Sequence, residues 1–186
     1  MKGIYWANAL LESTVILAEH FSSPLSDTIL SFLIRDTMRQ THNIRLTPTW
    51  LAGCMLMHCG ALIRLACYRT LGRFFTWELS LKKGHVLMTG GPYSIVRHPS
   101  YTGSLLLGVG VVLCHFSPGS WYAECIGWDT WASKLFTATW MAWSLAVPTL
   151  LMRRVETEDE VLRNEFGDEW EKYAEKTPYR LIPYLY

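Results

Sequence analysis

Arg97, His98 and Pro99 lie in a polar stretch, GPYSIVRHPSYTG, that runs from residue 91 to residue 103. Pro99 disfavours a helical conformation at His98 and suits the first turn of a following helix. The N-terminus of such a helix attracts carboxylates and phosphates, because its first N–H groups have no partner within the helix. The motif therefore predicts an anion- or cofactor-binding helix end. A juxtamembrane cap, with Arg97 bound to lipid phosphate, is an equally good interpretation.

A second candidate pair follows later in the chain, where Arg154 and Glu158 are four residues apart. This spacing places both side chains on one helical face, and a surface pair of this kind contributes only about 0.2–0.5 kcal/mol. Arginine can also hold a carboxylate through two parallel hydrogen bonds, and a glutamate can accept from hydroxyl or amino groups. From the residues alone, both a surface pair and a binding site remain open.

The elements that position these residues are predicted to span a membrane. Half of the 186 residues are hydrophobic and 18% are charged, against about 25% charged in soluble domains. Strong apolar runs cover 49–68, 101–116 and 135–152, and weaker runs cover 4–18 and 25–34. A spanning helix needs about 20 apolar residues, so each weaker run is a marginal span, an interfacial helix or half of a helical hairpin. We expect an all-α, multi-span transmembrane helical bundle with three clear spans and up to five.

The distribution of charge predicts orientation and excludes one class of partner. Five basic residues lie from Arg69 to Arg97, and Arg153 and Arg154 directly follow the last run, whereas Lys134 stands alone between the last two runs. The positive-inside rule places residues 69–100 and the tail in the cytoplasm. The formal net charge of +1 argues against a nucleic-acid partner.

Other polar and reactive residues have plainer interpretations. Arg64 lies near the end of the first strong run, where interhelical packing or snorkelling is expected. The five cysteines form no CxxC pair, so we expect buried thiols and no zinc site or disulfide framework. The Trp-rich segment 120–133 is typical of an interfacial aromatic belt.

The tail is predicted to form an amphipathic helix outside the membrane. Its large apolar residues recur at helical spacing, with acidic residues among them: Leu162, Phe166, Trp170 and Tyr173. Gly167 interrupts the pattern and indicates a turn between two shorter helices. Thr177-Pro178 ends the second of them.

Three motifs in the last hundred or so residues resemble one known family. HVLMTxGPYSxVRHPSYTG, over 85–103, resembles the first signature of the isoprenylcysteine carboxyl methyltransferase family. EDxxLxxxFGxEWxxY, over 158–173, resembles its second signature, and PYRLIP follows at 178–183. The two signatures flank an apolar hairpin in the family's order.

The resemblance implies a single membrane-embedded methyltransferase domain over 1–186, with weak helical segments in 1–48 and a catalytic core in 85–186. It implies S-adenosyl-L-methionine as cofactor and an endoplasmic reticulum membrane location, with the active site facing the cytoplasm. The expected reaction methylates the C-terminal carboxylate of a prenylated cysteine, a step of CAAX processing. The expected partners are a prenylated protein C-terminus or a lipophilic prenylcysteine, and membrane lipid.

Carried over residue by residue, the resemblance implies Arg154 as the catalytic residue, facing the substrate, and no metal ligand. It implies cofactor contacts from His85, Val86, Leu87, Met88, Tyr93, His98, Pro99, Ser100, Tyr101 and Glu158. Glu78 falls near a further cofactor contact in a loosely matched region. Asp159 stands where the family usually has a second glutamate, and Trp170 where tyrosine is common. The N-terminal half shows no match, which leaves the acceptor open.

The chemistry suits these residues, and it leaves two alternatives. A carboxylate acceptor is already ionised at neutral pH, so methyl transfer to it needs positioning and desolvation more than a base. A phospholipid amine or a small isoprenoid is the first alternative acceptor, and a non-catalytic membrane scaffold of the same fold is the second. A soluble Rossmann-type methyltransferase is disfavoured because the glycines at 84, 90 and 91 do not make GxGxxG.

Overall fold

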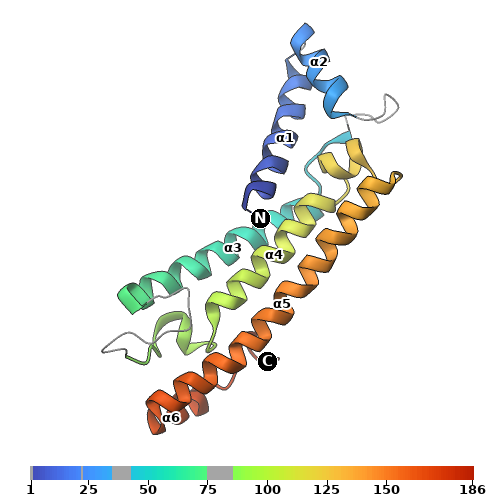
Figure 1. The fold of residues 1–186 in the computed structure, drawn as a ribbon. Helices are drawn as coiled ribbons and strands as arrows, with labels where there is room; N and C mark the ends of the chain where they lie inside the picture. Colours follow the sequence, from blue (N-terminus) through green and yellow to red (C-terminus); the bar gives the residue numbers. More distant parts are fainter. Residues whose placement is uncertain (1, 22, 35–42, 75–85) are drawn as a thin grey trace. The chain divides into compact units, whose positions relative to one another are not determined.

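The computed structural model describes residues 2–21, 23–34, 43–74 and 86–186, and its regular elements in these ranges are all helical (Figure 1). The α-helices are α1 (Lys2–His20), α2 (Pro24–Leu33), α3 (Pro48–Leu71), α4 (Pro99–Phe116), α5 (Trp131–Phe166) and α6 (Asp168–Lys176). Short 3-10 helices η2 (Gly72–Phe74) and η3 (Gly91–Ser94) and a π-helix η4 (Tyr122–Ile126) join them. His85 and Glu78 lie outside the described residues.

Three of the described helical segments are long and apolar enough to cross a membrane: Pro48–Phe74, Pro99–Phe116 and Trp131–Phe166. They contain the three strong apolar runs of the sequence. The predicted all-α membrane bundle with three clear spans is confirmed. The protein is a multi-pass membrane protein.

The chain divides into two compact units. The first comprises Met1–Met55 and Val109–Ala142, and the second comprises Leu56–Gly108 and Trp143–Tyr186. In the first unit the Trp-rich loop is only partly an exposed belt: Trp121 and Tyr122 are buried, whereas Trp131 is 81% exposed. The backbone N–H of Trp121 donates to the Glu12 carboxylate, so this part of the loop packs against α1.

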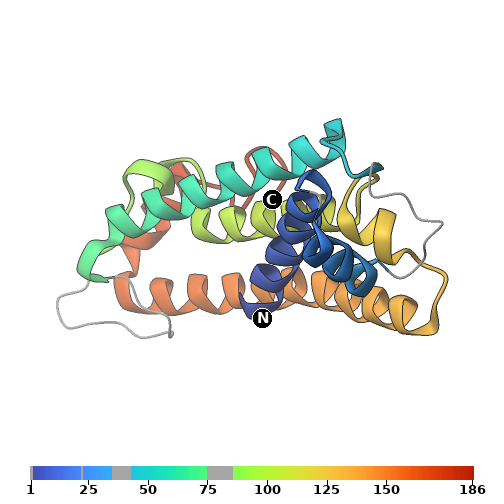
Figure 2. The ribbon, with the colours of Figure 1, turned by 90° about the horizontal axis from the view of Figure 1, so that it is seen from above.

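The residues expected to do chemistry all belong to the second unit, where α3 and α4 pack closely (Figure 2). A Cβ atom added at Gly60 would lie 2.5 Å from the carbonyl oxygen of Gly103, and one added at Gly103 would lie 2.7 Å from the carbonyl oxygen of Gly60. The two backbones therefore approach as closely as glycine alone allows. This contact lies one helical turn into α4 and sets the position of its N-terminal end.

Arg64 of α3 stabilises the same end of α4. Its Nη1 donates to the carbonyl oxygen of Ser100 at 3.1 Å and to the hydroxyl of Ser104, and Nη2 donates to the hydroxyl of Tyr68. Of the two expectations for Arg64, these contacts bear out interhelical packing. A partly buried guanidinium is stabilised by carbonyl and hydroxyl acceptors.

Two of the long helices begin at a proline. α3 begins at Pro48, and the hydroxyl of Thr47 accepts the N–H of Trp50 at 3.2 Å, which is the usual N-cap bond. α4 begins at Pro99, as the Arg-His-Pro motif predicts.

The tail is organised by the end of α5. α5 continues from its apolar part into the polar residues as one helix despite Pro148 in its interior, and the residues directly after Arg153 include good helix formers. Gly167 then adopts φ of 52°, a conformation that favours glycine, and α6 folds back against the end of α5 (Figure 1). Leu162, Phe166, Trp170 and Tyr173 pack around Leu87, so the predicted amphipathic tail and its turn are confirmed.

We expect Gly103→Ala to destabilise the protein by about 1–3 kcal/mol, because the added methyl meets backbone and the Arg64 stem and overpacks the interface. Gly108→Ala is the matched control, since a Cβ at Gly108 of the same helix meets nothing within 4 Å. Thermal unfolding in detergent micelles measures both. Equal midpoints for the two variants would contradict the close α3–α4 contact.

Candidate functional site

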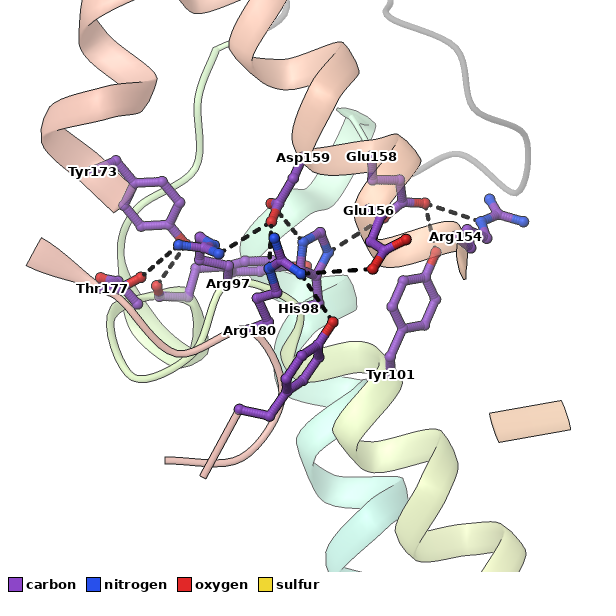
Figure 3. A network of polar contacts seen from close by, with 12 residues as sticks. Arg97, His98, Tyr101, Arg154, Glu156, Glu158, Asp159, Tyr173, Thr177 and Arg180 are labelled. Atoms are coloured by element: carbon purple, nitrogen blue, oxygen red, sulfur yellow. Dashed lines mark hydrogen bonds and ion pairs between the residues drawn. The ribbon is translucent and has the colours of Figure 1, made fainter. Parts of the chain in front are cut away.

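The N-terminal end of α4 and the second half of α5 meet at a buried histidine, His98 (Figure 3). Its Nε2 lies 2.9 Å from Oδ1 of Asp159, and its Nδ1 lies 3.4 Å from Oε2 of Glu158. The hydroxyl of Tyr101 donates to Oε1 of Glu158 at 2.5 Å. The structure thus brings His98 and Tyr101 together with two acidic residues that lie about sixty positions later in the sequence.

Local geometry explains how one ring reaches two consecutive carboxylates. Successive residues of an α-helix point about 100° apart, so Glu158 and Asp159 diverge from the axis of α5. His98 precedes the first turn of α4, and its ring is parallel to that of Tyr101, with centroids 5.9 Å apart and planes inclined by 10°. The ring therefore lies between the two carboxylates, with one nitrogen facing each.

Arg154 contacts the same glutamate from the edge of the network (Figure 3). Its Nε donates to Oε1 of Glu158 at 3.0 Å, and its side chain is 40% exposed, compared with 23% for Glu158. Glu158 is thus more than one half of a surface pair, because a histidine, a tyrosine and an arginine all face its carboxylate. The more exposed Arg154 is placed to meet a ligand that arrives from outside.

Arg97 is part of the protein's own packing, so the lipid-phosphate interpretation of its side chain is wrong. Its Nη2 donates to Oδ2 of Asp159 at 3.1 Å, Nη1 donates to the carbonyl oxygen of Thr177 at 3.4 Å, and the guanidinium lies 5.6 Å from the Trp170 ring centroid. Its side chain is only 9% exposed. Buried arginines of this kind are stabilised by charge pairing and by an aromatic face.

The segment after α6 docks on the same loop. The backbone N–H groups of Arg97 and His98 donate to the carbonyl oxygens of Tyr179 and Arg180, both at 2.9 Å. The N–H groups just before α4 are therefore already bonded within the chain. Leu181 is 1% exposed and packs against the body of this unit, whereas Tyr184 and Leu185 after it are 88% and 78% exposed.

The remaining predicted cofactor residues fall into three groups. Pro99 is buried at the start of α4, and Ser100 faces Arg64. Leu87 is buried against Trp170 and Tyr173, and the backbone carbonyl of Tyr93 accepts the Tyr173 hydroxyl at 2.8 Å. Val86 is about half exposed and Met88 is partly buried; within the described part of the chain neither makes a polar contact with the network around His98.

The contacts of His98 determine its charge. Burial alone lowers the pKa of His98. The hydrogen bonds to Asp159 and Glu158 and the negative charges of these carboxylates together raise the pKa by more than burial lowers it, so it lies above the ordinary 6.5. Carboxylates only accept hydrogen bonds, so two of them facing both ring nitrogens favour the doubly protonated imidazolium. Burial raises the pKa of the Tyr93 and Tyr173 phenols, so both remain hydroxyl donors at neutral pH.

Sequence reasoning missed the roles of Asp159 and Arg180. Oδ2 of Asp159 accepts from Nε of Arg180 at 3.3 Å as well as from Arg97. Asp159 stood out in the sequence only as a departure from a family pattern, and Arg180 only as part of a motif. The sequence signal that could have found Asp159 was its position, as an acid one residue after Glu158.

The exposed part of the site suits a cationic ligand that carries hydroxyl and amino groups. Glu158 retains partial exposure, and a carboxylate accepts hydrogen bonds from such groups. Arg154 beside it suits an anionic second ligand. Within the described residues no group of three or more His, Cys, Asp or Glu side chains could hold a metal ion.

We expect the thermal midpoint to fall as pH rises through the folded pKa of His98. A raised folded pKa makes the stabilisation complete below the unfolded value of about 6.5 and removes it above the folded value. Melting curves in detergent from pH 6 upward measure this, and in His98→Gln the same decline should be smaller. An identical pH dependence in wild type and His98→Gln would contradict the charged state of His98.

Comparisons with known proteins place the sequence beside one family. Residues 52–139 match the family model described as "Isoprenylcysteine carboxyl methyltransferase (ICMT) family". Protein-S-isoprenylcysteine O-methyltransferase B of Arabidopsis thaliana is 23% identical over 184 residues, which cover 94% of this chain and 80% of that protein. A probable protein-S-isoprenylcysteine O-methyltransferase of Oryza sativa subsp. indica is 31% identical over 128 residues, 67% of this chain and 56% of that protein.

Part of the chain is also similar to a protein of different chemistry. A Delta(14)-sterol reductase of Saccharomyces cerevisiae is 30% identical over 109 residues, which cover 59% of this chain but only 21% of the reductase. The match to the Arabidopsis methyltransferase, in contrast, extends over nearly the whole chain. The family model, the two plant relatives and the three candidate membrane-spanning helices support the same conclusion. The chain belongs to the isoprenylcysteine carboxyl methyltransferase family.

Proposed function

We propose that the protein transfers a methyl group from S-adenosylmethionine to the C-terminal carboxylate of a prenylated cysteine at the membrane surface. The observation that carries the proposal is the pairing of Arg154 with Glu158 beside His98 and Tyr101. This arrangement offers an acceptor of hydrogen bonds and a cation side by side, just beyond the apolar part of α5. The names of the plant relatives support this substrate class.

Glu158 would hold the cofactor by accepting from its hydroxyl or amino groups. S-adenosylmethionine, when bound, supplies a methyl group on a positively charged sulfur. The Tyr101 hydroxyl and the His98 ring hold the Glu158 carboxylate in place. The Glu158 side chain therefore loses little conformational entropy when the cofactor binds. Tyr101 also presents an aromatic ring next to that carboxylate.

Arg154 would hold the acceptor carboxylate by a charge-assisted bond. A prenylcysteine carboxylate is ionised at neutral pH, because the α-carboxyl pKa is about 3.3–3.7. The acceptor therefore needs orientation and removal of water, and no base. Both ring nitrogens of His98 face carboxylates, which leaves this residue unsuited to take a proton.

That property of His98 also bears on the alternative acceptors. A phospholipid amine must lose a proton to be methylated, so its site requires a nearby base. Tyr93 and Tyr173 have raised pKa values and do not serve as bases at neutral pH. The charge of Arg154 favours an anionic acceptor over an ammonium group.

The proposed setting is the endoplasmic reticulum membrane, with the site facing the cytoplasm. The basic residues around Arg69–Arg97 and Arg153–Arg154 support this orientation through the positive-inside rule. The chain would act as one membrane-embedded domain with its catalytic core in 85–186. A prenylated protein C-terminus or a free lipophilic prenylcysteine, together with membrane lipid, would be its partners.

The function is tested with purified protein in lipid nanodiscs and S-adenosylmethionine labelled in the methyl group. Farnesylcysteine and phosphatidylethanolamine are offered in parallel. We expect label in a base-labile methyl ester of farnesylcysteine and none in the phospholipid. Label in phosphatidylethanolamine alone would establish the amine acceptor, and binding of no cofactor would support a scaffold.

Two substitutions should separate acceptor binding from cofactor binding. We expect Arg154→Ala to lower turnover of farnesylcysteine at least about 30-fold, since truncating one partner of a close charge pair costs about 2–5 kcal/mol, with cofactor affinity nearly unchanged. Glu158→Ala should instead weaken cofactor affinity first. Calorimetric titration with S-adenosylmethionine and initial-rate assays measure the two effects.

Neighbouring residues supply the controls for this pair. Arg153 and Glu160 lie on the same helix, and both are exposed, so Arg153→Ala and Glu160→Ala remove the same charges outside the network. Both should behave like wild type. Equal loss of cofactor affinity in Arg154→Ala and Glu158→Ala would overturn the assignment of separate roles.

A further inference from the structure

Asp159 is a buried carboxylate that receives donors from two other segments of the chain (Figure 3). It is 5% exposed. Oδ1 faces Nε2 of His98 at 2.9 Å, and Oδ2 lies 3.1 Å from Nη2 of Arg97 and 3.3 Å from Nε of Arg180. Three donors enclose this carboxylate, which makes Asp159 unsuited to touch a ligand directly.

The contact with His98 links Asp159 to the residue proposed to hold the cofactor. The imidazole ring is rigid, so fixing Nε2 against Asp159 also fixes the direction of Nδ1. Nδ1 faces Oε2 of Glu158 at 3.4 Å. Asp159 and Glu158 are neighbours in sequence, but the link between their carboxylates runs through the ring of a residue about sixty positions earlier.

The charges around His98 come from each element packed against it. Glu158 and Asp159 of α5 face its nitrogens, and Tyr101 of α4 lies parallel to its ring. Arg97 of the preceding loop and Arg180 of the C-terminal segment approach it only through Asp159. Without the charge of Asp159, His98 would face Glu158 alone and two nearby guanidinium groups would disfavour its protonation.

We propose that Asp159 is a positioning residue of the cofactor site, which holds His98 as a fixed cation and through it orients the carboxylate of Glu158. The statement that Glu158 binds the cofactor rests on the proposed function, whereas the link from Asp159 to His98 rests on the contacts alone. Arg180 brings the C-terminal segment to the same carboxylate. Loss of Asp159 should therefore loosen both the ring and the segment, and the experiment must separate these effects.

The test uses full-length protein in detergent micelles with ¹⁵N-labelled histidine, and the His98 signal is assigned from its loss in His98→Gln. In wild type, His98 should titrate above 6.5. Asp159→Asn should lower that pKa by at least about one unit, as loss of an opposite charge within 4–6 Å predicts. At a pH one unit above the lowered pKa, affinity for S-adenosylmethionine should fall about tenfold, since only about one molecule in ten then has a charged His98, and the loss should be larger at higher pH.

Three further variants complete the design. Glu160→Gln, which neutralises the next and exposed acid, should leave both the His98 titration and cofactor affinity as in wild type. Arg180→Gln releases the C-terminal segment from Asp159 and should leave the His98 pKa at or above its wild-type value. Asp159→Glu restores the charge and should recover a raised pKa.

Several outcomes overturn the proposal. An ordinary or lowered His98 pKa in wild type does so even if Asp159→Asn fails to fold, and so does an unchanged His98 pKa in folded Asp159→Asn. If cofactor affinity falls equally in Arg180→Gln and Asp159→Asn, Asp159 only holds the C-terminal segment and does not position His98. A wild type that binds no S-adenosylmethionine but shows the predicted His98 titration would refute the proposed function and leave the His98–Asp159 link standing.

Discussion

The arrangement depends on one cation held between two consecutive carboxylates. His98 is buried, and a buried charge is tolerated only where opposite charges and hydrogen bonds compensate for the lost water. Glu158 and Asp159 provide that compensation, and Arg97 and Arg180 balance the second carboxylate in turn. Because these groups come from the loop before α4, from α5 and from the C-terminal segment, the network is complete only when all three are packed. Formation of the site is therefore coupled to the folding of this unit.

Helix packing supplies the accuracy that such a network requires. A displacement of α4 by an ångström would separate His98 from one of the two carboxylates, and charge-assisted bonds weaken steeply beyond their normal length. Contact of backbones at Gly60 and Gly103 leaves little freedom for such movement, and Arg64 fixes the first turn of α4 through Ser100. The apolar face of the tail around Leu87 and Trp170 holds the other side of the loop. Packing thus positions the loop from two directions, while the charges determine its fine geometry.

Local signals in the sequence were sufficient for the helices and for one half of the site. Pro99 and Gly167 act on their immediate neighbours, and the structure begins or ends helices where they predict. The contacts of Asp159 with Arg97 and of Arg97 with Thr177 join residues 62 and 80 positions apart, and no local pattern encodes such distances. Arg64 was predictable as a buried arginine but its acceptors were not, since they lie on another helix. The resemblance assigned Glu158 and His98 to one cofactor site, which the local pattern of residues alone did not do.

Similarity to a Delta(14)-sterol reductase over 59% of this chain limits what the fold by itself implies. A stretch of sequence compatible with two chemistries cannot alone select methyl transfer, because function depends on groups that touch the ligands. Features such as the glycine contact of α3 and α4 or the enclosed carboxylate of Asp159 position the network and carry no preference for a reaction. Arg154 differs, because it is the most exposed charged member of the network around Glu158 and it faces outward from the enclosed histidine. Under the proposed function, selection of a carboxylate acceptor would rest on Arg154 at the edge of the network, and the buried charges behind it would keep its partner Glu158 in one place.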